Sequence, residues 1–348
     1  MMLNLLTALD SEKYEIFVIS KPGGPLVDKV IELGFHYIPV STLRRNISVF
    51  DILAFFDILR ICQKYQFDIV HTHSSKTGFI GRIAARIVGV KKIIHTIHGF
   101  AFHQFQPKFI QYFYIFMEWI SAKFCDKIVF VNNADREYAI KNKLISRKKA
   151  VTIFNGIEIP KVQRKKVFRE FRDFFIIGSV SRFSKQKNIV NLINIAIKVC
   201  KKNRKIKFVF IGDGEQYSIC QKLVKEAEME TRILLKGWLL NVIEWLQNFD
   251  AFILFSKWEG LPISILEAMS VGLPIIASDI KGNNELVSEE NGILVPVNDT
   301  VELEKILSVL HQRKDDLIRW GENSRKIVDK KFNFNIFVKS YENLYNKK

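Results

Sequence analysis

Short apolar runs alternate with longer segments of helical periodicity along the chain. The apolar runs have the length and composition of buried strands and occupy residues 14–20, 67–73, 91–98 and 127–133, then 174–183, 205–214, 231–238, 250–256 and 274–279. Residues 28–34, 51–65 and 78–90 show the spacing of amphipathic helices between the early runs. This alternation predicts parallel sheets that are covered on both faces by helices.

The strand-and-helix pattern runs twice, and a charged segment separates the two series. Residues 161–172, KVQRKKVFREFR, have no clean apolar face and indicate a linker with a surface segment. We therefore expect an α/β protein of two doubly wound domains, which a chain of 348 residues can support. Ligands in such folds bind beyond the carboxyl ends of the strands, so the cleft between two facing domains is the expected site.

The formal net charge of +17 suggests an anionic partner: nucleic acid, an acidic membrane surface or a phosphorylated ligand. The excess is spread along the chain, because Lys and Arg outnumber Asp and Glu by 21 to 13 in residues 1–160 and by 32 to 23 in residues 161–348. A composition rich in Lys, Ile and Phe explains the charge equally well. No nucleic acid partner is expected, because recognition-helix motifs and interleaved basic and aromatic strands are missing.

The cysteines and the apolar segments bear on the cellular compartment. Cys62, Cys125, Cys200 and Cys220 form no C-x-x-C pair, which predicts reduced thiols in the core of a cytoplasmic protein. The N-terminus lacks the pattern of a signal peptide, and no uncharged apolar stretch reaches 18 residues. We therefore expect neither secretion nor a membrane span.

Two acids stand out in the stretch KWEGLPISILEAMSVG at residues 257–272. Gly260 permits a tight turn after a buried strand, and Pro262 suits the first turn of a helix. The first amides of that helix form a natural phosphate site, from which Glu259 and Glu267 could reach a sugar. The alternative is ordinary: Glu259 stabilises the helix start and Glu267 is a solvated helix residue.

Several further segments accompany these acids and share features with one enzyme family. The spacing E-x7-E is followed by GLPIIASDIKGNNELV and NGILVPVND, and it is preceded by VHTHSSKTGFIGRIAARIVGV (70–90), HTIHG (95–99), FNGIE (154–158) and SRFSKQKN (181–188). Together they resemble the retaining GT-B glycosyltransferases of family 4, which build bacterial capsule and lipopolysaccharide sugars. The resemblance implies an acceptor-side Rossmann-like domain at 1–158, a domain at 159–330 that binds the nucleotide sugar, and a helix at 331–348 that crosses back toward the first domain.

The resemblance also implies a donor site. Arg182 and Lys187 would neutralise the diphosphate of the nucleotide sugar, and Glu267 would bind the ribose hydroxyls. Glu259 would contact the donor sugar and stabilise positive charge at its anomeric carbon, and His98 would hydrogen-bond the sugar or phosphate. Amides of Gly260, Leu261 and Ile263 would cradle the phosphate, while Gly212 and Gly214 would shape the turn near the nucleotide. Without the resemblance, a solvated Arg and Lys and a buried His are the simpler interpretations.

Two segments bear on the acceptor. Ser74, Ser75 and Lys76 open a helix directly after a strand and could grip an acceptor phosphate, although simple capping by Ser explains them equally well. Residues 98–125 hold seven phenylalanines, and the helix that follows Pro107 is apolar nearly all round. Such a helix is either buried or lies in a membrane interface, and burial is the preferred interpretation.

The sequence therefore predicts a glycosyltransferase that moves a hexose or N-acetylhexosamine, with retention, from a UDP-linked sugar to a lipid-linked or polysaccharide acceptor. It would be cytoplasmic, peripheral on the anionic inner face of the plasma membrane, and without cofactor or metal, because the histidines lack the spacing of ligands. A nucleotide-sugar epimerase and an inactive nucleotide-binding scaffold are the alternatives.

The chain begins at a helix, MMLNLLTALD, whereas members of the resembled family begin with a strand and a glycine-rich turn. The sequence therefore favours membership of the family over activity of the chain as printed.

Overall fold

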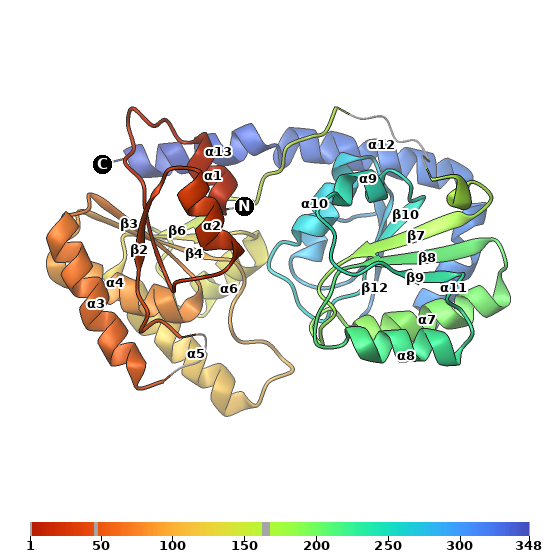
Figure 1. Ribbon diagram of the computed structural model, residues 1–348, viewed down its shortest axis with the longest axis horizontal. Coiled ribbons are helices and arrows are strands. Elements are labelled where there is room, and N and C mark those ends of the chain that lie inside the picture. The colour runs from red at the N-terminus through yellow and green to blue at the C-terminus, as the bar shows by residue number, and fades with distance from the viewer. Residues whose placement is uncertain (1, 45–47, 162–167, 348) are drawn as a thin grey trace. The chain divides into compact units, whose positions relative to one another are not determined.

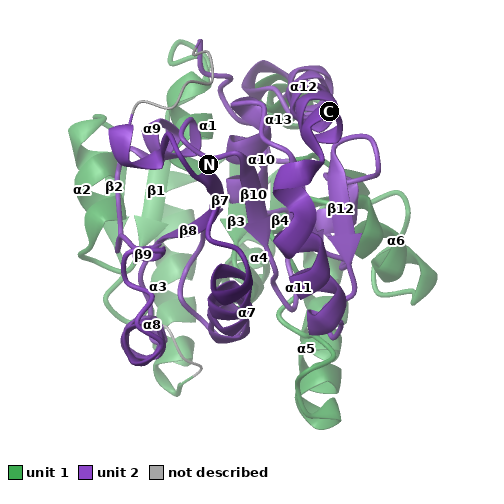
Figure 2. Cartoon of the chain, turned by 90° about the vertical axis from the view of Figure 1, so that its right-hand side faces the viewer, with its two compact units in different colours: residues 1–154, 337–348 green, residues 155–336 purple. Residues whose placement is uncertain are grey.

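A computed structural model describes residues 2–44, 48–161 and 168–347 (Figure 1). The chain divides into two compact units, coloured in Figure 2: residues 1–154 with 337–348, and residues 155–336. The first unit is therefore built from two separate pieces of chain, and the second is continuous. Of the linker predicted at 161–172, residues 162–167 lie outside the described residues.

The first unit contains a parallel sheet of order β3-β4-β5-β6 and a separate parallel pair, β1-β2. The strands are β1 (Phe17–Ser20), β2 (His36–Pro39), β3 (Ile69–His73), β4 (Lys92–Ile97), β5 (Lys127–Phe130) and β6 (Ala150–Thr152). The four strands predicted for this part of the chain are confirmed with shorter bounds. The strands β2 and β6 are additional, and each is too short to show a clear apolar pattern.

The first unit also contains the helices that pack around its strands. They are α1 (Met2–Ala8), α2 (Pro25–Glu32), α3 (Phe50–Tyr65), α4 (Ser75–Val88), α5 (Lys108–Ser121), α6 (Asn133–Lys141) and α13 (Phe334–Asn346), which belongs to this unit from residue 337 on. The helix α4 packs against both α3 and α5, and its Ala84 and Ala85 join buried clusters with Val70 and Ile93 of the sheet. On the opposite face, Tyr341 of α13 reaches Thr96 of β4.

The second unit has a single parallel sheet of order β12-β11-β10-β7-β8-β9. The strands are β7 (Phe175–Val180), β8 (Ile206–Ile211), β9 (Ile233–Leu235), β10 (Ala251–Leu254), β11 (Ile275–Ser278) and β12 (Gly292–Val295). The chain adds β8 and β9 on one side of β7 and then returns to place β10 on the other side. This reversal makes the carboxyl ends of β7 and β10 the switch point, where doubly wound sheets hold their ligands.

Helices also cover both faces of this sheet. They are α7 (Ile189–Lys202), α8 (Tyr217–Glu226), α9 (Val242–Leu246), α10 (Ile263–Ser270), α11 (Thr300–Val309) and α12 (Lys314–Lys331). The helices α7, α8 and α11 share a buried core with Phe208 and Phe210, while α10 packs against α9 and α12. Short 3-10 turns are η1 (Ala122–Phe124), η2 (Arg169–Phe171), η3 (Asn283–Glu285) and η4 (Leu310–Gln312).

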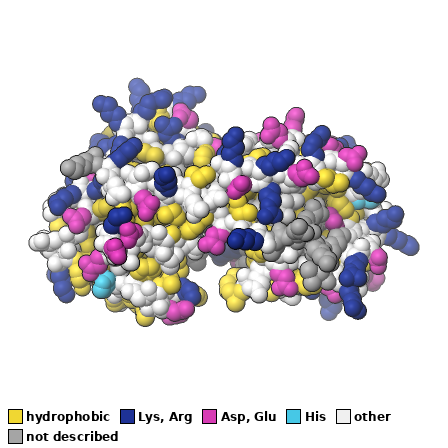
Figure 3. All heavy atoms as spheres, turned by 90° about the horizontal axis from the view of Figure 1, so that it is seen from above, with side chains coloured by type: hydrophobic (Ala, Val, Ile, Leu, Met, Phe, Trp, Pro, Cys, Tyr) yellow, Lys and Arg dark blue, Asp and Glu magenta, His cyan; other side chains and the backbone are white. Residues whose placement is uncertain are grey.

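The surface charge, the cysteines and the length of the helices also bear on the expectations from sequence. Among the side chains coloured by type in Figure 3, basic and acidic groups are interspersed, so the net charge is not gathered on that face. All four cysteines are buried and free of disulfides. Of the helices within the described ranges, none combines the length and the apolar character needed to cross a bilayer.

Candidate functional site

An ion pair joins the carboxyl ends of β7 and β10 at the switch point of the second unit. The Nζ atom of Lys187 lies 2.6 Å from Oε1 of Glu259, and the two side chains are only 17% and 7% exposed. Both residues therefore occupy one shielded spot, as a shared role would require. The Nζ of Lys187 carries three N–H donors, so it retains donors for an anionic ligand beside Glu259.

Hydrogen bonds to the main chain hold this spot together. The Nε2 of Gln186 donates to the carbonyl of Trp258 (2.9 Å), and the amide of Lys257 donates to the carbonyl of Gln186 (2.8 Å). These two bonds tie the loop after β7 to the loop after β10. The sequence did not single out Gln186, although it stands next to Lys187 in the SRFSKQKN segment.

Arg182 lies in the same loop as Lys187 but is placed differently. Its Nη2 is 3.3 Å from Oε2 of Glu215, which follows β8, and both side chains are exposed. An exposed pair of this kind is weak, so a phosphate can displace Glu215 at little free-energy cost. The structure thus pairs Lys187 with Glu259 and leaves Arg182 to a separate, looser contact.

Glu267 lies in the second turn of α10 and is partly buried. Burial raises the pKa of its carboxyl above the usual value. Within the described parts of the chain, no side chain is ion-paired or hydrogen-bonded to this carboxylate. A desolvated acceptor of this kind is not the solvated helix residue of the ordinary interpretation, and it can take two neighbouring hydroxyl donors.

The turn before α10 is held by a residue from a distant segment of the chain. The Nδ2 of Asn155, from the FNGIE segment, donates to the carbonyl of Leu261 (3.2 Å), and both residues are buried. Pro262 stands at the N-cap without a side-chain cap, and Ile263 begins the helix. The first amides of α10, that of Ile263 among them, receive no side-chain cap from Pro262, while Gly260 and Leu261 of the predicted phosphate cradle precede the helix.

Gly212 and Gly214 let the loop after β8 approach the loop after β7. A Cβ at Gly212 would lie 2.0 Å from the carbonyl oxygen of Ser181, and its φ of 136° already disfavours other residues. The amide of Phe183 donates to the carbonyl of Asp213 (2.9 Å) across the same junction. These glycines thus shape the edge that carries Arg182.

In the first unit, His98 follows β4 and hydrogen-bonds His73 at the end of β3. The Nδ1 of His73 is 3.0 Å from Nε2 of His98, and the two rings stack. Burial lowers the pKa of both rings, that of His73 to about 3. Both histidines are therefore neutral at pH 7. The sequence singled out His98 alone, although the ends of adjacent parallel strands necessarily meet.

A second layer of polar groups lies behind this pair. The Nδ1 of His71 is 2.7 Å from the hydroxyl of Tyr345, and its Nε2 is 2.8 Å from Oγ1 of Thr96. Thr96 in turn is 3.1 Å from the hydroxyl of Tyr341. Burial lowers the pKa of His71 well below the usual value, so this ring is also neutral.

The start of α4 contains the predicted acceptor residues. Ser74 has φ 63° and makes no side-chain cap, so the simple capping interpretation is wrong for it. A non-glycine residue at positive φ is strained, which is frequent at binding sites. Lys76 is committed elsewhere, because its Nζ lies 2.5 Å from Oδ1 of Asp51 and donates to the carbonyl of Arg44.

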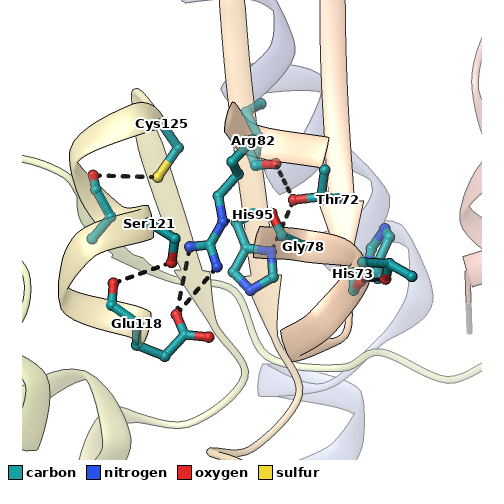
Figure 4. A network of polar contacts seen from close by, with 11 residues as sticks. Thr72, His73, Gly78, Arg82, His95, Glu118, Ser121 and Cys125 are labelled. Atoms are coloured by element: carbon teal, nitrogen blue, oxygen red, sulfur yellow. Dashed lines mark hydrogen bonds and ion pairs between the residues drawn. The ribbon is translucent and has the colours of Figure 1, made fainter. Parts of the chain in front are cut away.

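A buried ion pair fixes α5 against α4 (Figure 4). Arg82 is fully buried, donates from Nε to the carbonyl of Gly78 (2.8 Å) and reaches Oε2 of Glu118 at 3.4 Å. Burial raises the pKa of Glu118, although Arg82 opposes this shift. Gly78 is required here, since a Cβ would lie 2.3 Å from the ring of His95.

The helix α5 is exposed where the sequence predicted burial. Its buried residues are the polar Glu118 and Ser121. Most of its aromatic residues are exposed, with Phe109 74% and Tyr112 67% exposed and Phe113, Phe116 and Trp119 also exposed. The preferred interpretation of a buried helix was wrong, because the Arg82–Glu118 pair turns the polar side of α5 inward.

The histidines do not form a metal site in the described part of the chain, where no group of three His, Cys, Asp or Glu side chains could hold an ion. Of the four ring nitrogens of His73 and His98, Nδ1 of His73 and Nε2 of His98 bond to each other.

The sequence comparisons match both units to glycosyltransferases. The family described as Glycosyl transferases group 1 matches residues 161–327, and Glycosyltransferase Family 4 matches residues 1–160. The UDP-Gal:α-D-GlcNAc-diphosphoundecaprenol α-1,3-galactosyltransferase of Escherichia coli is 35% identical over 344 residues, or 92% of this chain and 89% of that protein. The N,N'-diacetylbacillosaminyl-diphospho-undecaprenol α-1,3-N-acetylgalactosaminyltransferase of Campylobacter jejuni is 24% identical over 99% of this chain and 94% of that protein.

Solved structures show the same architecture. Anabaena HepE in complex with UDP and glucose superposes with a TM-score of 0.83 at 16% identity, covering 99% of this chain and 95% of that one. The sucrose-phosphate synthase of Thermosynechococcus elongatus superposes with a TM-score of 0.79 at 17% identity, covering 98% and 90%. The expected GT-B fold of two Rossmann-like units is confirmed.

Proposed function

Because the chain belongs to the family 4 glycosyltransferases, we propose that it transfers a hexose or N-acetylhexosamine from a UDP-sugar to a diphosphate-linked lipid acceptor in cell-surface glycan synthesis. The named relatives support this choice, since one uses UDP-Gal and both act on diphosphoundecaprenol-linked sugars. The observation that carries the donor half is the shielded contact between Lys187 and Glu259 at the switch point of the second unit.

The donor diphosphate would bind where α10 begins. The amides at the start of α10, with Ile263 at the first helical position, would face it with the positive end of the helix dipole, and the preceding amides of Gly260 and Leu261 would complete the predicted cradle. Lys187 supplies a point charge, and Arg182 can leave Glu215 to add its planar fork. With two cations and a helix start to carry the leaving charge, we expect turnover without a divalent metal. An excess of EDTA that abolished turnover would contradict this.

The ribose would lie against Glu267. Its carboxylate is partly desolvated and has room for two hydroxyl donors, which are the 2' and 3' groups of a ribonucleotide. Glu259, one loop away, would then face the sugar and stabilise positive charge that develops at the anomeric carbon. When Lys187 binds the diphosphate, the Glu259 carboxylate can turn toward the sugar.

The proposed chemistry proceeds with retention of configuration. The bond between the anomeric carbon and the phosphate oxygen breaks while the acceptor oxygen forms its new bond on the same face. The acceptor hydroxyl gives its proton to the departing phosphate oxygen, so UDP leaves with that proton. The protein orients the reactants and neutralises charge, and no covalent sugar–enzyme intermediate is needed.

The acceptor would use the first unit. His98 offers a ring nitrogen to a sugar or phosphate oxygen, and the strained turn at Ser74 and Ser75 presents the start of α4. Lys76 is held by Asp51, so we assign it a supporting role unless the acceptor displaces that carboxylate.

The exposed aromatic face of α5 is proposed to contact an anionic membrane. Phe, Tyr and Trp side chains favour the bilayer interface, and Lys108 and Lys123 flank them with positive charge. Lys123 also lies 3.7 Å above the ring of Trp119. A lipid-linked acceptor resides in such a membrane, so this contact would bring the enzyme to its substrate on the inner face of the plasma membrane.

Calorimetric titration with UDP, beside Glu267→Ala, tests the donor site first. Binding that is lost in the variant supports it, whereas silence toward UDP, GDP and ADP alike contradicts it. Incubation with UDP-sugars and a diphosphate-linked lipid acceptor then separates the activities. Release of UDP only when acceptor is present indicates a transferase; conversion of the sugar without acceptor would indicate the epimerase, and binding without turnover a scaffold.

A further inference from the structure

We propose that His73 is a positioning residue that holds His98 in one orientation and one neutral tautomer, so that Nδ1 of His98 donates to a substrate oxygen. This inference rests on the proposed function, because it assigns His98 a substrate to meet. It adds a residue and a specific atom that neither the sequence motifs nor the comparisons identify.

The backbone brings the two rings together. In the sheet, His73 of β3 pairs with Thr96 of β4, two residues before His98. The chain leaves β4 at His98 and turns at Gly99, whose φ is 136°. The stacked rings are 5.3 Å apart at their centroids with an interplanar angle of 23°, and the Nδ1–Nε2 distance is 3.0 Å. This is hydrogen-bond geometry between two imidazoles.

His73 is itself fixed from behind. Its ring centroid lies 4.3 Å from that of His71. Both nitrogens of His71 are engaged, by Tyr345 of α13 and by Thr96, and Thr96 is engaged by Tyr341. The other titratable groups that adjoin this layer are His95, hydrogen-bonded to Thr72, and Arg82 beyond it. His73 therefore rests against the neutral ring of His71, which is itself held by hydrogen bonds on both sides.

The bond makes the tautomer of one ring depend on that of the other. An N–H···N bond needs one donor and one acceptor, so the two rings cannot both be imidazolium. Burial keeps both neutral at pH 7. When Nδ1–H of His73 donates to Nε2 of His98, the one proton of His98 sits on Nδ1. That N–H points away from His73 and serves an acceptor atom, which suits the oxygens of phosphate and sugar.

The matched variants are His73→Asn and His73→Leu. An Asn side chain places its amide nitrogen near the position of Nδ1 and can still donate to His98, whereas Leu has similar volume and no polar atom. We expect His73→Leu to lower kcat/KM of transfer about 10- to 100-fold, as loss of an orienting partner does for other histidines. His73→Asn should recover most of that loss, and UDP affinity should be unchanged in both.

A combined variant tests whether the two residues act as one. Against His98→Ala, the further change His73→Leu should have no added effect on transfer, because the residue that it positions is gone. Independent, multiplying losses would overturn the proposal, and so would equal damage from Asn and Leu at position 73.

The tautomer can be measured without turnover. Long-range proton–nitrogen correlation spectra of the intact, histidine-labelled protein should show His98 protonated at Nδ1 in the wild type and a mixture in His73→Leu. An unchanged tautomer in His73→Leu would refute the positioning role. If the wild type fails to bind UDP or transfer sugar while the tautomer result holds, the functional proposal fails and the pairing stands.

Discussion

Lys187 and Glu259 stand 72 residues apart in the chain and meet at 2.6 Å in a spot that water scarcely reaches. Removal of either partner leaves a shielded charge alone. We expect Lys187→Met and Glu259→Gln each to reduce kcat/KM about 100- to 1,000-fold, since each removes a group that faces charge in the transition state. Steady-state assays of UDP release with acceptor provide the measurement.

Measurements of the free energy of unfolding distinguish a loss of catalysis from a loss of folding in these variants. Lys187→Met should also lower the free energy of unfolding by about 3 kcal/mol because Glu259 is left unpaired. The double variant Lys187→Met with Glu259→Met should regain most of that stability in urea titrations while it stays inactive. If activity returned together with stability, the pair would be structural only.

Glu267 offers a prediction about pH. Burial raises its folded-state pKa, so the folded protein binds more protons than the unfolded chain, and the stability from this group is lost as pH rises through that pKa. Glu267→Gln should therefore raise the melting temperature at pH 7, by about 2–4 °C for each 1 kcal/mol gained. The same variant should bind UDP more weakly than the wild type.

The pH dependence of UDP affinity tests whether the Glu267 carboxylate binds the ribose. Hydroxyls bind the ionised carboxylate, so UDP affinity of the wild type should weaken as the pH falls toward the raised pKa of Glu267. The residual affinity of Glu267→Gln should lack this dependence. A wild-type affinity that was flat from pH 5 to pH 8 would speak against ribose binding at Glu267.

The Arg82–Glu118 pair should behave as a buried ion pair. Arg82→Met should lower the free energy of unfolding by about 3–5 kcal/mol at pH 7. The loss should shrink at acid pH, because Glu118 without Arg82 has a still higher pKa and is more easily neutralised. Chemical denaturation at two pH values measures both effects. Arg82→Met combined with Glu118→Leu should recover stability, and failure to do so would show that the helices depend on the charges themselves.

Membrane contact depends on the aromatic face of α5. The triple variant Phe109→Ser, Phe113→Ser and Phe116→Ser should lose co-sedimentation with vesicles that contain anionic lipid and should keep UDP affinity. The matched control is Ile219→Ser with Val301→Ser, which removes exposed apolar side chains from the other unit. If the triple variant still bound vesicles, or if the wild type did not, the membrane proposal would fail; a concentration-dependent dimer broken by the same variant would assign the face to self-association.

The strands were the most predictable part of the fold. Runs such as 67–73 and 205–214 are long, apolar and flanked by polar turns, so β3 and β8 were identified from pattern alone. The strand β2 consists of HYIP, with a proline and partly exposed side chains, and carries no such pattern. The strand β6 is a three-residue edge strand that gains its partner only from the neighbouring β5.

The helix α5 shows why the environment of an element is harder to predict than its type. Its composition favours burial, and that expectation was wrong because one long-range ion pair decides which side faces the core. The contacts within the candidate site were also hard to predict from sequence. Lys187 and Glu259 were both selected from motifs, but their direct contact, and that of His73 with His98, follows from strand order rather than from local sequence.

The first unit contains the residues at both ends of the chain, because residues 337–348 return to it after the whole second unit. A recombinant fragment of residues 1–154 would lack Tyr341 and Tyr345 and would leave His71 and Thr96 without their hydroxyl partners. The continuous piece 155–336 faces no such difficulty. Dissection of this enzyme should therefore begin with the second half expressed alone, and any version of the first half must carry the tail spliced onto it.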